Sequence, residues 1–328
     1  MPHDTEPGRR KKSRSVQIVT AIAGISVGVV CLWLVLRGSD IAELKAALLA
    51  ADFTHLAVAL VMFWLSIVIR IVRWHRLLVL VAPIRRRHVA ESAIVGYAAS
   101  IVMPARLGEP FRAEYTQRRF HLNRYAVFGS IVTERLIDAI SVVVILLTGL
   151  ALVARHTLIA DSSQLRAVGT TALAIIAATV VILIILRFRH LTRIRLPHWL
   201  DEPIRKLLHG VASLNQRNIA SVLLFTLLIW SFETAALWAV FHSLGTNLSV
   251  GQLLLLTGIA ALSTLIPAAP GYIGSLQLVF SLGMISMKLP AAPGILAATI
   301  VQLIFYGSLI IAASLVAILR CYQSVGRR

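Results

Sequence analysis

Hydrophobic blocks of about 20 residues recur along this chain, and they constrain its fold more than any other feature. A helix of about 20 residues, rising about 1.5 Å per residue, crosses a hydrocarbon core of roughly 30 Å. Lipid offers the backbone no hydrogen-bond partners, so each block must be helical. Of the 328 residues, 58% are hydrophobic and 14% are charged, whereas soluble chains are roughly a quarter charged. The sequence therefore predicts an all-α polytopic membrane protein.

Six blocks are long enough to be full transmembrane helices, at about residues 16–36, 53–72, 125–153, 167–186, 219–241 and 295–319. The formal net charge is +18. Because this topology places most Lys and Arg on one side, the charge indicates the positive-inside bias of an inner membrane and predicts no nucleic-acid partner. A basic N-terminus (residues 1–15) and tail (residues 321–328) are then both cytoplasmic. The first block is too long for a cleaved signal peptide and predicts a retained helix.

Two apolar segments are broken. Residues 91–123 have basic flanks on both sides, which favours a re-entrant hairpin that turns between Pro104 and Gly108. Residues 253–287 are interrupted at Pro267, Pro270, Gly271 and Gly274; they form either a second re-entrant hairpin or two spans. Between the halves, residues 200–214 predict an interfacial helix.

The two breaks match at a constant offset of 163 residues. Pro104-Ala105-x-x-Gly108 recurs as Pro267-Ala268-x-x-Gly271, and Arg70 falls on Glu233. Each half, residues 16–153 and 154–320, then reads as two helices, a hairpin and a helix. Three full crossings are an odd number, so the second half is inverted, as in many transporters. The alternative is chance recurrence in a Gly/Ala-rich chain.

Charged residues inside the apolar blocks are the candidate functional residues, since each costs about 2.5 to 3.5 kcal/mol at the bilayer centre. Guanidiniums and broken helices both suit a phosphate. We predict a lipid head-group site and an intramembrane polar network. The first comprises Arg70, Arg73, Arg106, Glu109 and Arg112, and the second Glu134, Arg135, Asp138 and Glu233. Alternatively, Arg70, Arg73 and Arg112 snorkel to the cytoplasmic head groups, or the network is structural only.

Enzyme motifs are missing from the sequence. It has no Gly-x-x-x-x-Gly-Lys-Ser/Thr phosphate loop, no Gly-x-Ser-x-Gly elbow and no His-Glu-x-x-His. The predicted topology places Cys31 and Cys321 near opposite membrane faces, which excludes a disulfide between them. We therefore expect no catalytic residues, no cofactor and no metal.

The segment from Gly96 to Arg112, with its Pro-x-Arg-x-Gly-Glu block, resembles a flippase-like family related to the transmembrane domain of lysylphosphatidylglycerol synthases. Arg70-x-x-Arg73-Trp74, Glu134-Arg135-x-x-Asp138 and Pro267-x-x-Pro270-Gly271-x-x-Gly274 stand in the family's order. The family often has Asn at the position of Ser100 and an acid at that of Gln277. Its two-domain members add a cytosolic aminoacyl-transferase domain, but this sequence stops at Arg328, so synthase activity is not implied.

What the resemblance implies is translocation of a lipid: an anionic phospholipid, a glycolipid, a polyprenyl-linked lipid or a hopanoid. Two other functions stay open. One is a membrane-embedded transferase that acts on a lipid-linked donor with Glu109 or Asp138 as base. The other is a non-catalytic partner of a lipid-modifying enzyme. Lipid, direction, coupling and oligomeric state are left open.

Overall fold

The computed structural model describes residues 46, 49–80, 82–103, 107–156, 216–264 and 270–325. Within these ranges all regular structure is helical. Four helices are long and apolar enough to cross a membrane: Phe53–Val79, Arg124–Val153, Ile219–Ser243 and Ala291–Arg320. They correspond to four of the six predicted spans, which confirms an all-helical membrane protein. The predicted spans 16–36 and 167–186 and the interfacial helix 200–214 lie outside the described residues.

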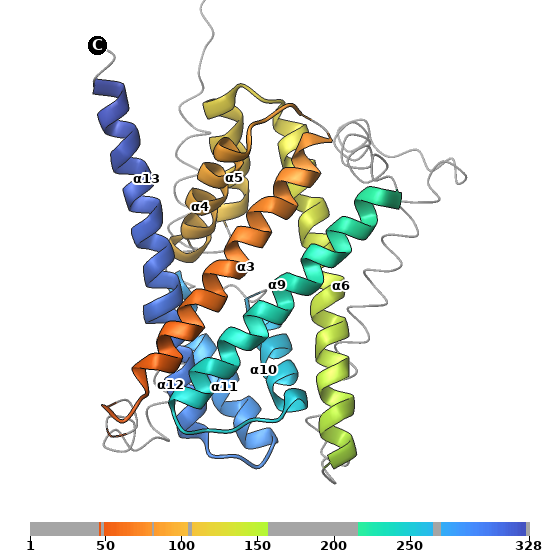
Figure 1. Cartoon of the computed structure of the whole chain (residues 1–328), viewed down its shortest axis with the longest axis vertical. Coiled ribbons are helices and arrows are strands. Elements are labelled where there is room, and N and C mark those ends of the chain that lie inside the picture. Colours follow the sequence, from red (N-terminus) through yellow and green to blue (C-terminus); the bar gives the residue numbers. More distant parts are fainter. Residues whose placement is uncertain are drawn as a thin grey trace, which may run out of the picture.

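Two long helices pack along each other through the middle of the molecule. They are α3 (Phe53–Val79) and α9 (Gln216–Ser243), drawn in orange and green in Figure 1. Small residues of both, Ala59, Ala236 and Ala239, are buried in the shared core, as close helix packing in membranes requires. α3 continues past the predicted end at residue 72 to Val79, so Arg70 and Arg73 lie inside the helix and not at its end.

The first broken segment forms two short helices, α4 (Arg86–Val102) and α5 (Gly108–Phe120). They pack against each other. A transmembrane helix needs about 20 residues, and both helices are shorter than that. Their approach is close at Gly108, where an added Cβ would lie 2.2 Å from the backbone nitrogen of Ser100. The turn residues Pro104 and Arg106 lie outside the described residues.

The second broken segment consists of α10 (Val250–Ser263), the short helix η3 (Pro270–Tyr272) and α11 (Ser275–Ser286). Gly271 and Gly274 have φ angles of 70° and 82°, a region in which only glycine is unstrained, while Pro267 lies outside the described residues. Figure 1 shows α4 and α5 towards one end of the molecule and α10 and α11 towards the other. The two broken segments thus approach the middle from opposite ends, where η3 contacts α4.

The remaining helices enclose these pairs. α6 (Arg124–His156) packs on α10 so closely that an added Cβ on Gly149 would lie 2.4 Å from the backbone nitrogen of Leu255. The last apolar stretch runs through α12 (Ala291–Ile300), a π-helical turn η4 (Val301–Tyr306) and α13 (Gly307–Val325). π-helical turns are rare inside long helices and are frequent at functional sites. This one carries Tyr306 beside the cavity described below.

Candidate functional site: an ion network beside a cavity

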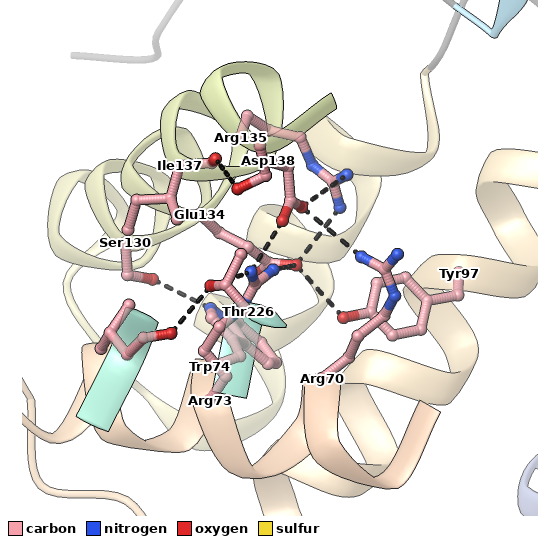
Figure 2. A network of polar contacts seen from close by, with 12 residues as sticks. Arg70, Arg73, Trp74, Tyr97, Ser130, Glu134, Arg135, Ile137, Asp138 and Thr226 are labelled. Carbon is pink, nitrogen blue, oxygen red and sulfur yellow. Dashed lines mark hydrogen bonds and ion pairs between the residues drawn. The ribbon is translucent and has the colours of Figure 1, made fainter. Parts of the chain in front are cut away.

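The charged residues predicted from the sequence converge in the interior from the four helices α3, α5, α6 and α9. Figure 2 shows the members on α3 and α6, which are Arg70, Arg73, Glu134, Arg135 and Asp138. Arg70 and Arg73 are three residues apart and share one face of α3, and Glu134 and Asp138 are four apart and share one face of α6. Arg112 comes from α5 and Glu233 from α9. The helical spacing therefore presents two arginines of one span to two carboxylates of another.

Two ion pairs form the inner part of the network. Arg73 Nη1 lies 2.7 Å from Asp138 Oδ1 and also donates to the Thr226 hydroxyl at 2.9 Å. Arg112 Nη2 donates to Glu134 Oε2 at 2.9 Å. The side chains of Arg73, Arg112 and Glu134 are no more than 1% exposed. Such charges are tolerated at this burial only because each has a partner.

Aromatic rings complete the surroundings of Arg112. Its guanidinium carbon lies 3.5 Å from the centroid of the Trp74 ring and 4.9 Å from that of Tyr97. The Tyr97 hydroxyl donates to Glu134 at 3.3 Å. Gly96 makes room for this arrangement, since an added Cβ there would lie 2.6 Å from the Arg112 side chain. A planar guanidinium can stack on aromatic rings and at the same time donate hydrogen bonds in its own plane, whereas an ammonium group cannot.

Two further ion pairs form the outer part. Arg70 Nη2 donates to Glu233 Oε1 at 2.5 Å, and Arg135 Nε lies 3.0 Å from Glu109 Oε1. Both arginines also approach Asp138. The Nη1 atom of each lies 3.5 Å from Asp138 Oδ2. With four guanidiniums and four carboxylates, the network has no formal net charge.

A cavity of about 540 Å³ adjoins the outer pairs. Its charged wall is shared by five residues: Arg70, Glu109, Arg135, Asp138 and Glu233. The rest of its wall is mostly apolar and includes Phe63, Val142, Leu237, Leu276, Phe280 and Phe305. This volume is in the usual range for a small-molecule pocket. A ligand with a polar end and an apolar body matches this cavity, because charged side chains line one part of its wall and apolar side chains line the rest.

The structure thus brings together eight of the nine predicted charged residues, since Arg106 lies outside the described residues. It separates the predicted head-group residues into two kinds. Arg70 and Glu109 line the cavity, while Arg73 and Arg112 are buried behind it. Neither of these buried arginines reaches the surface, so they do not snorkel. Arg135, predicted only as a network member, lines the cavity as well.

The second break is held by amide side chains. Gln277 donates to Gln302 Oε1 at 2.6 Å and accepts from the Gly274 N–H at 2.9 Å. Gln302, in the π-helical turn, donates to the Gly271 carbonyl oxygen at 3.1 Å. Gln277 therefore joins the start of α11 to the π-helical turn, and Gln302 joins that turn to η3. This link was not predicted from the sequence, and neither were Thr226 or Tyr97 as partners in the ion network.

Membrane-spanning helices, two opposed broken segments and a charge-lined cavity define a polytopic membrane protein with an internal polar site. The described residues contain no group of three His, Cys, Asp or Glu side chains that could hold a metal ion. The chain belongs to the family of the lysylphosphatidylglycerol synthase transmembrane region, whose family model matches residues 21–313. The family resemblance seen in the sequence is thereby confirmed. No curated protein matches the chain.

Proposed function

We propose that this protein is a lipid translocase that moves a lipid with a polar head group across the inner membrane without hydrolysing ATP. One observation carries the proposal: the cavity combines a charged wall with an apolar wall, between helices that cross the membrane. A polar head group that crosses lipid unaided meets the desolvation cost of its charge. Fixed charges along its path replace the lost water and lower that barrier.

An inverted repeat, with six spans and two re-entrant hairpins, is the second part of the proposal. Helix boundaries support it. α3 begins at Phe53 and α9 begins at Gln216, which is 163 residues later. α4 begins at Arg86, and the residue 163 positions later is Ser249, the N-cap of α10. Arg70 and Glu233, also 163 apart, form an ion pair. Residues that are related by a two-fold axis and touch one another must lie beside that axis, so this contact is what an inverted repeat requires of such a pair.

Alternating access follows from such a plan. The two hairpins would take turns in closing the cavity towards one face, while the lipid tails stay in the bilayer. The basic connections next to α4 and α5 support a cytoplasmic location for this end, and the proposal assigns both termini to the same side. An anionic phospholipid, a glycolipid, a polyprenyl-linked lipid or a hopanoid could supply the head group.

A reconstitution assay tests the proposal. The purified protein is placed in phosphatidylcholine vesicles with a fluorescent phosphatidylglycerol, and the rate of its appearance in the outer leaflet is measured by chemical quenching. We expect faster transfer than in vesicles without protein. Ala260 lines the cavity, so Ala260→Phe should fill it and slow transfer. Ala317→Phe, on the exposed side of α13, is the matched control and should transfer at the wild-type rate.

Transfer at the protein-free rate with every head group tried would refute translocation. Formation of a new lipid product from a lipid-linked donor would favour the transferase instead. An effect seen only when a lipid-modifying enzyme is present would favour the non-catalytic partner.

A further inference from the structure

Asp138 brings two cavity arginines close together. Its Oδ2 atom lies 3.5 Å from Arg70 Nη1 and 3.5 Å from Arg135 Nη1. The two Nη1 atoms are therefore separated by no more than twice that distance. Two oxygens of one phosphate, each accepting a charge-assisted hydrogen bond of about 2.8 Å, can cover this separation. The arginines come from different helices, α3 and α6, and they meet at the cavity wall.

We propose that Arg70 and Arg135 together bind a single phosphate group of the lipid, and that Glu109 and Glu233 are exchangeable counter-ions that occupy these arginines when no lipid is bound. The inference rests on the proposed translocation, because it assigns the part of the lipid that the cavity holds. It also changes the site predicted from the sequence. Arg135 enters the head-group site, and Arg73 and Arg112 leave it.

Burial separates the two kinds of arginine. The side chains of Arg70 and Arg135 are 12% and 32% exposed, whereas those of Arg73 and Arg112 are 0% and 1% exposed. Arg73 donates to Asp138 and Thr226, and Arg112 lies between Trp74 and Tyr97 while it donates to Glu134. A phosphate cannot reach these two without dismantling the inner pairs. Their role is to hold Glu134 and Asp138 in position.

The carboxylates also fall into two kinds. Glu134 and Asp138 each contact three arginines. Glu109 contacts Arg135 and Glu233 contacts Arg70, and both glutamates are 25% exposed at the cavity wall. If either glutamate swings away, its arginine still has Asp138 as a partner. An incoming phosphate can therefore take the glutamate's place on the arginine without leaving a buried guanidinium unpaired.

Charge balance then links binding to protons. A phosphodiester adds a negative charge to a wall that already carries three carboxylates and two guanidiniums. Glu233 contacts Arg70 on α3 and interacts electrostatically with Tyr306 on η4. Asp138 on α6 lies on the other side of Arg70 and lines the same cavity. Glu109 faces Arg135, behind which lie Glu134 and Asp138. Among the described residues, Glu109 and Glu233 each contact one arginine and no second cation. A displaced glutamate therefore takes up a proton and gives it back when the phosphate leaves.

Calorimetry on the full-length protein in phosphatidylcholine nanodiscs tests the site. The probe is a short-chain phosphatidylglycerol, titrated in two buffers of different ionisation enthalpy so that proton uptake is counted. We expect uptake on binding and weaker binding as pH rises. Arg70→Ala and Arg135→Ala should each weaken binding about tenfold or more, the loss expected for a hydrogen bond between charged groups.

The glutamate variants give the sharper result. Glu109→Gln and Glu233→Gln remove a competing carboxylate, so each should bind the probe several-fold more tightly, with less proton uptake and a flatter pH profile. Glu114→Gln is the matched control, because Glu114 is on α5 like Glu109 but pairs with Arg118 and Arg124 away from the cavity. Thermal denaturation of each variant checks that it is folded.

The outcomes separate the two proposals. Unchanged affinity in both arginine variants overturns the phosphate site, and equal proton uptake in wild type and both glutamine variants overturns the exchange of counter-ions. Equal affinity for inorganic phosphate overturns the assignment to a lipid. If the probe binds as expected but vesicles show no transfer, the site stands and translocation fails. If transfer occurs and no variant changes probe binding, translocation stands and this inference fails.

Discussion

Glu134 is the residue on which the interior network most depends. It accepts hydrogen bonds from Arg112 and Tyr97 and contacts Arg73 and Arg135, with none of its side chain exposed. Glu134→Gln leaves the buried guanidinium of Arg112 uncompensated, so we expect a loss of about 3 to 5 kcal/mol in the free energy of unfolding. Thermal denaturation in detergent measures it. Ser141→Ala, which removes only a bond within α6, should have little effect.

Arg112 depends on its shape as well as its charge. Its guanidinium stacks on Trp74 at 3.5 Å while it donates to Glu134. Arg112→Lys keeps the charge and loses the planar stack, so we expect destabilisation by about 2 kcal/mol, the upper range for a desolvated cation–π contact. Denaturation midpoints of this variant and of Arg118→Lys, at an exposed position on the same helix, give the comparison. Equal midpoints would show that the charge alone is sufficient.

At the scale of elements, the first hairpin depends on one close approach. A Cβ at position 108 would lie 2.2 Å from both the nitrogen and the Oγ of Ser100, and the backbone nitrogen cannot move aside without shifting α4. Gly108→Ala should therefore cost about 1 to 3 kcal/mol, as overpacking usually does. Gly307→Ala meets nothing within 4 Å and should be neutral or slightly stabilising. Thermal denaturation of the two alanine variants tests the difference.

The start of α3 has a pH-dependent cap. The pKa of Asp52 is lowered from its usual value by the hydrogen bond with His55 and by the Thr54 N–H, which donates at 2.8 Å. A lowered pKa in the folded state means that the cap contributes stability above the unfolded pKa, about 4, and loses it as pH falls through the folded value. Amide exchange in the first turn should be faster in Asp52→Ala than in wild type near neutral pH, and this difference should shrink in acid. Asp52→Asn keeps the cap and should show less pH dependence.

Element boundaries show what the sequence could predict. The four described spans follow from apolar length, because hydrophobicity alone decides whether a helix can lie in lipid. The end of α3 was not predictable in this way. In the sequence alone, Arg73 indicates the end of a membrane span. α3 nevertheless continues to Val79, because Asp138 on α6 neutralises the charge of Arg73 inside the protein. That compensation comes from tertiary packing, which no local pattern contains.

The candidate site was also predictable only in part: its residues could be identified from the sequence, but their arrangement could not. The presence of charges at depth and their spacing on α3 and α6 identified eight residues that do meet. Which of them line the cavity could not be predicted, because Arg70 and Arg73 have the same side chain on the same face of α3 and differ only in how deeply the tertiary packing buries them. The π-helical turn at Val301–Tyr306 and its link from Gln302 to Gly271 also leave no trace in hydropathy. Such features require the packed structure.

For the whole molecule, the proposed inverted repeat makes a prediction about sidedness. The helix α5, of the first hairpin, ends near Arg118, and the connection from α9 to α10 contains Asn247; both residues are exposed. If the two hairpins enter from opposite faces, these two positions lie on opposite sides of the membrane. Single cysteines, Arg118→Cys and Asn247→Cys, are introduced after Cys31 and Cys321 are replaced by serine.

A membrane-impermeant maleimide then reports the side of each cysteine in intact cells. Asn247→Cys should be labelled from outside, and Arg118→Cys should be labelled only after the membrane is permeabilised, because the arginine-rich end of a membrane protein stays in the cytoplasm. Labelling of both positions from one side would contradict the inverted plan. It would also argue against alternating access, since hairpins on the same face cannot close the cavity alternately. The same labelling in the presence of phosphatidylglycerol would show which hairpin opens when the cavity is occupied.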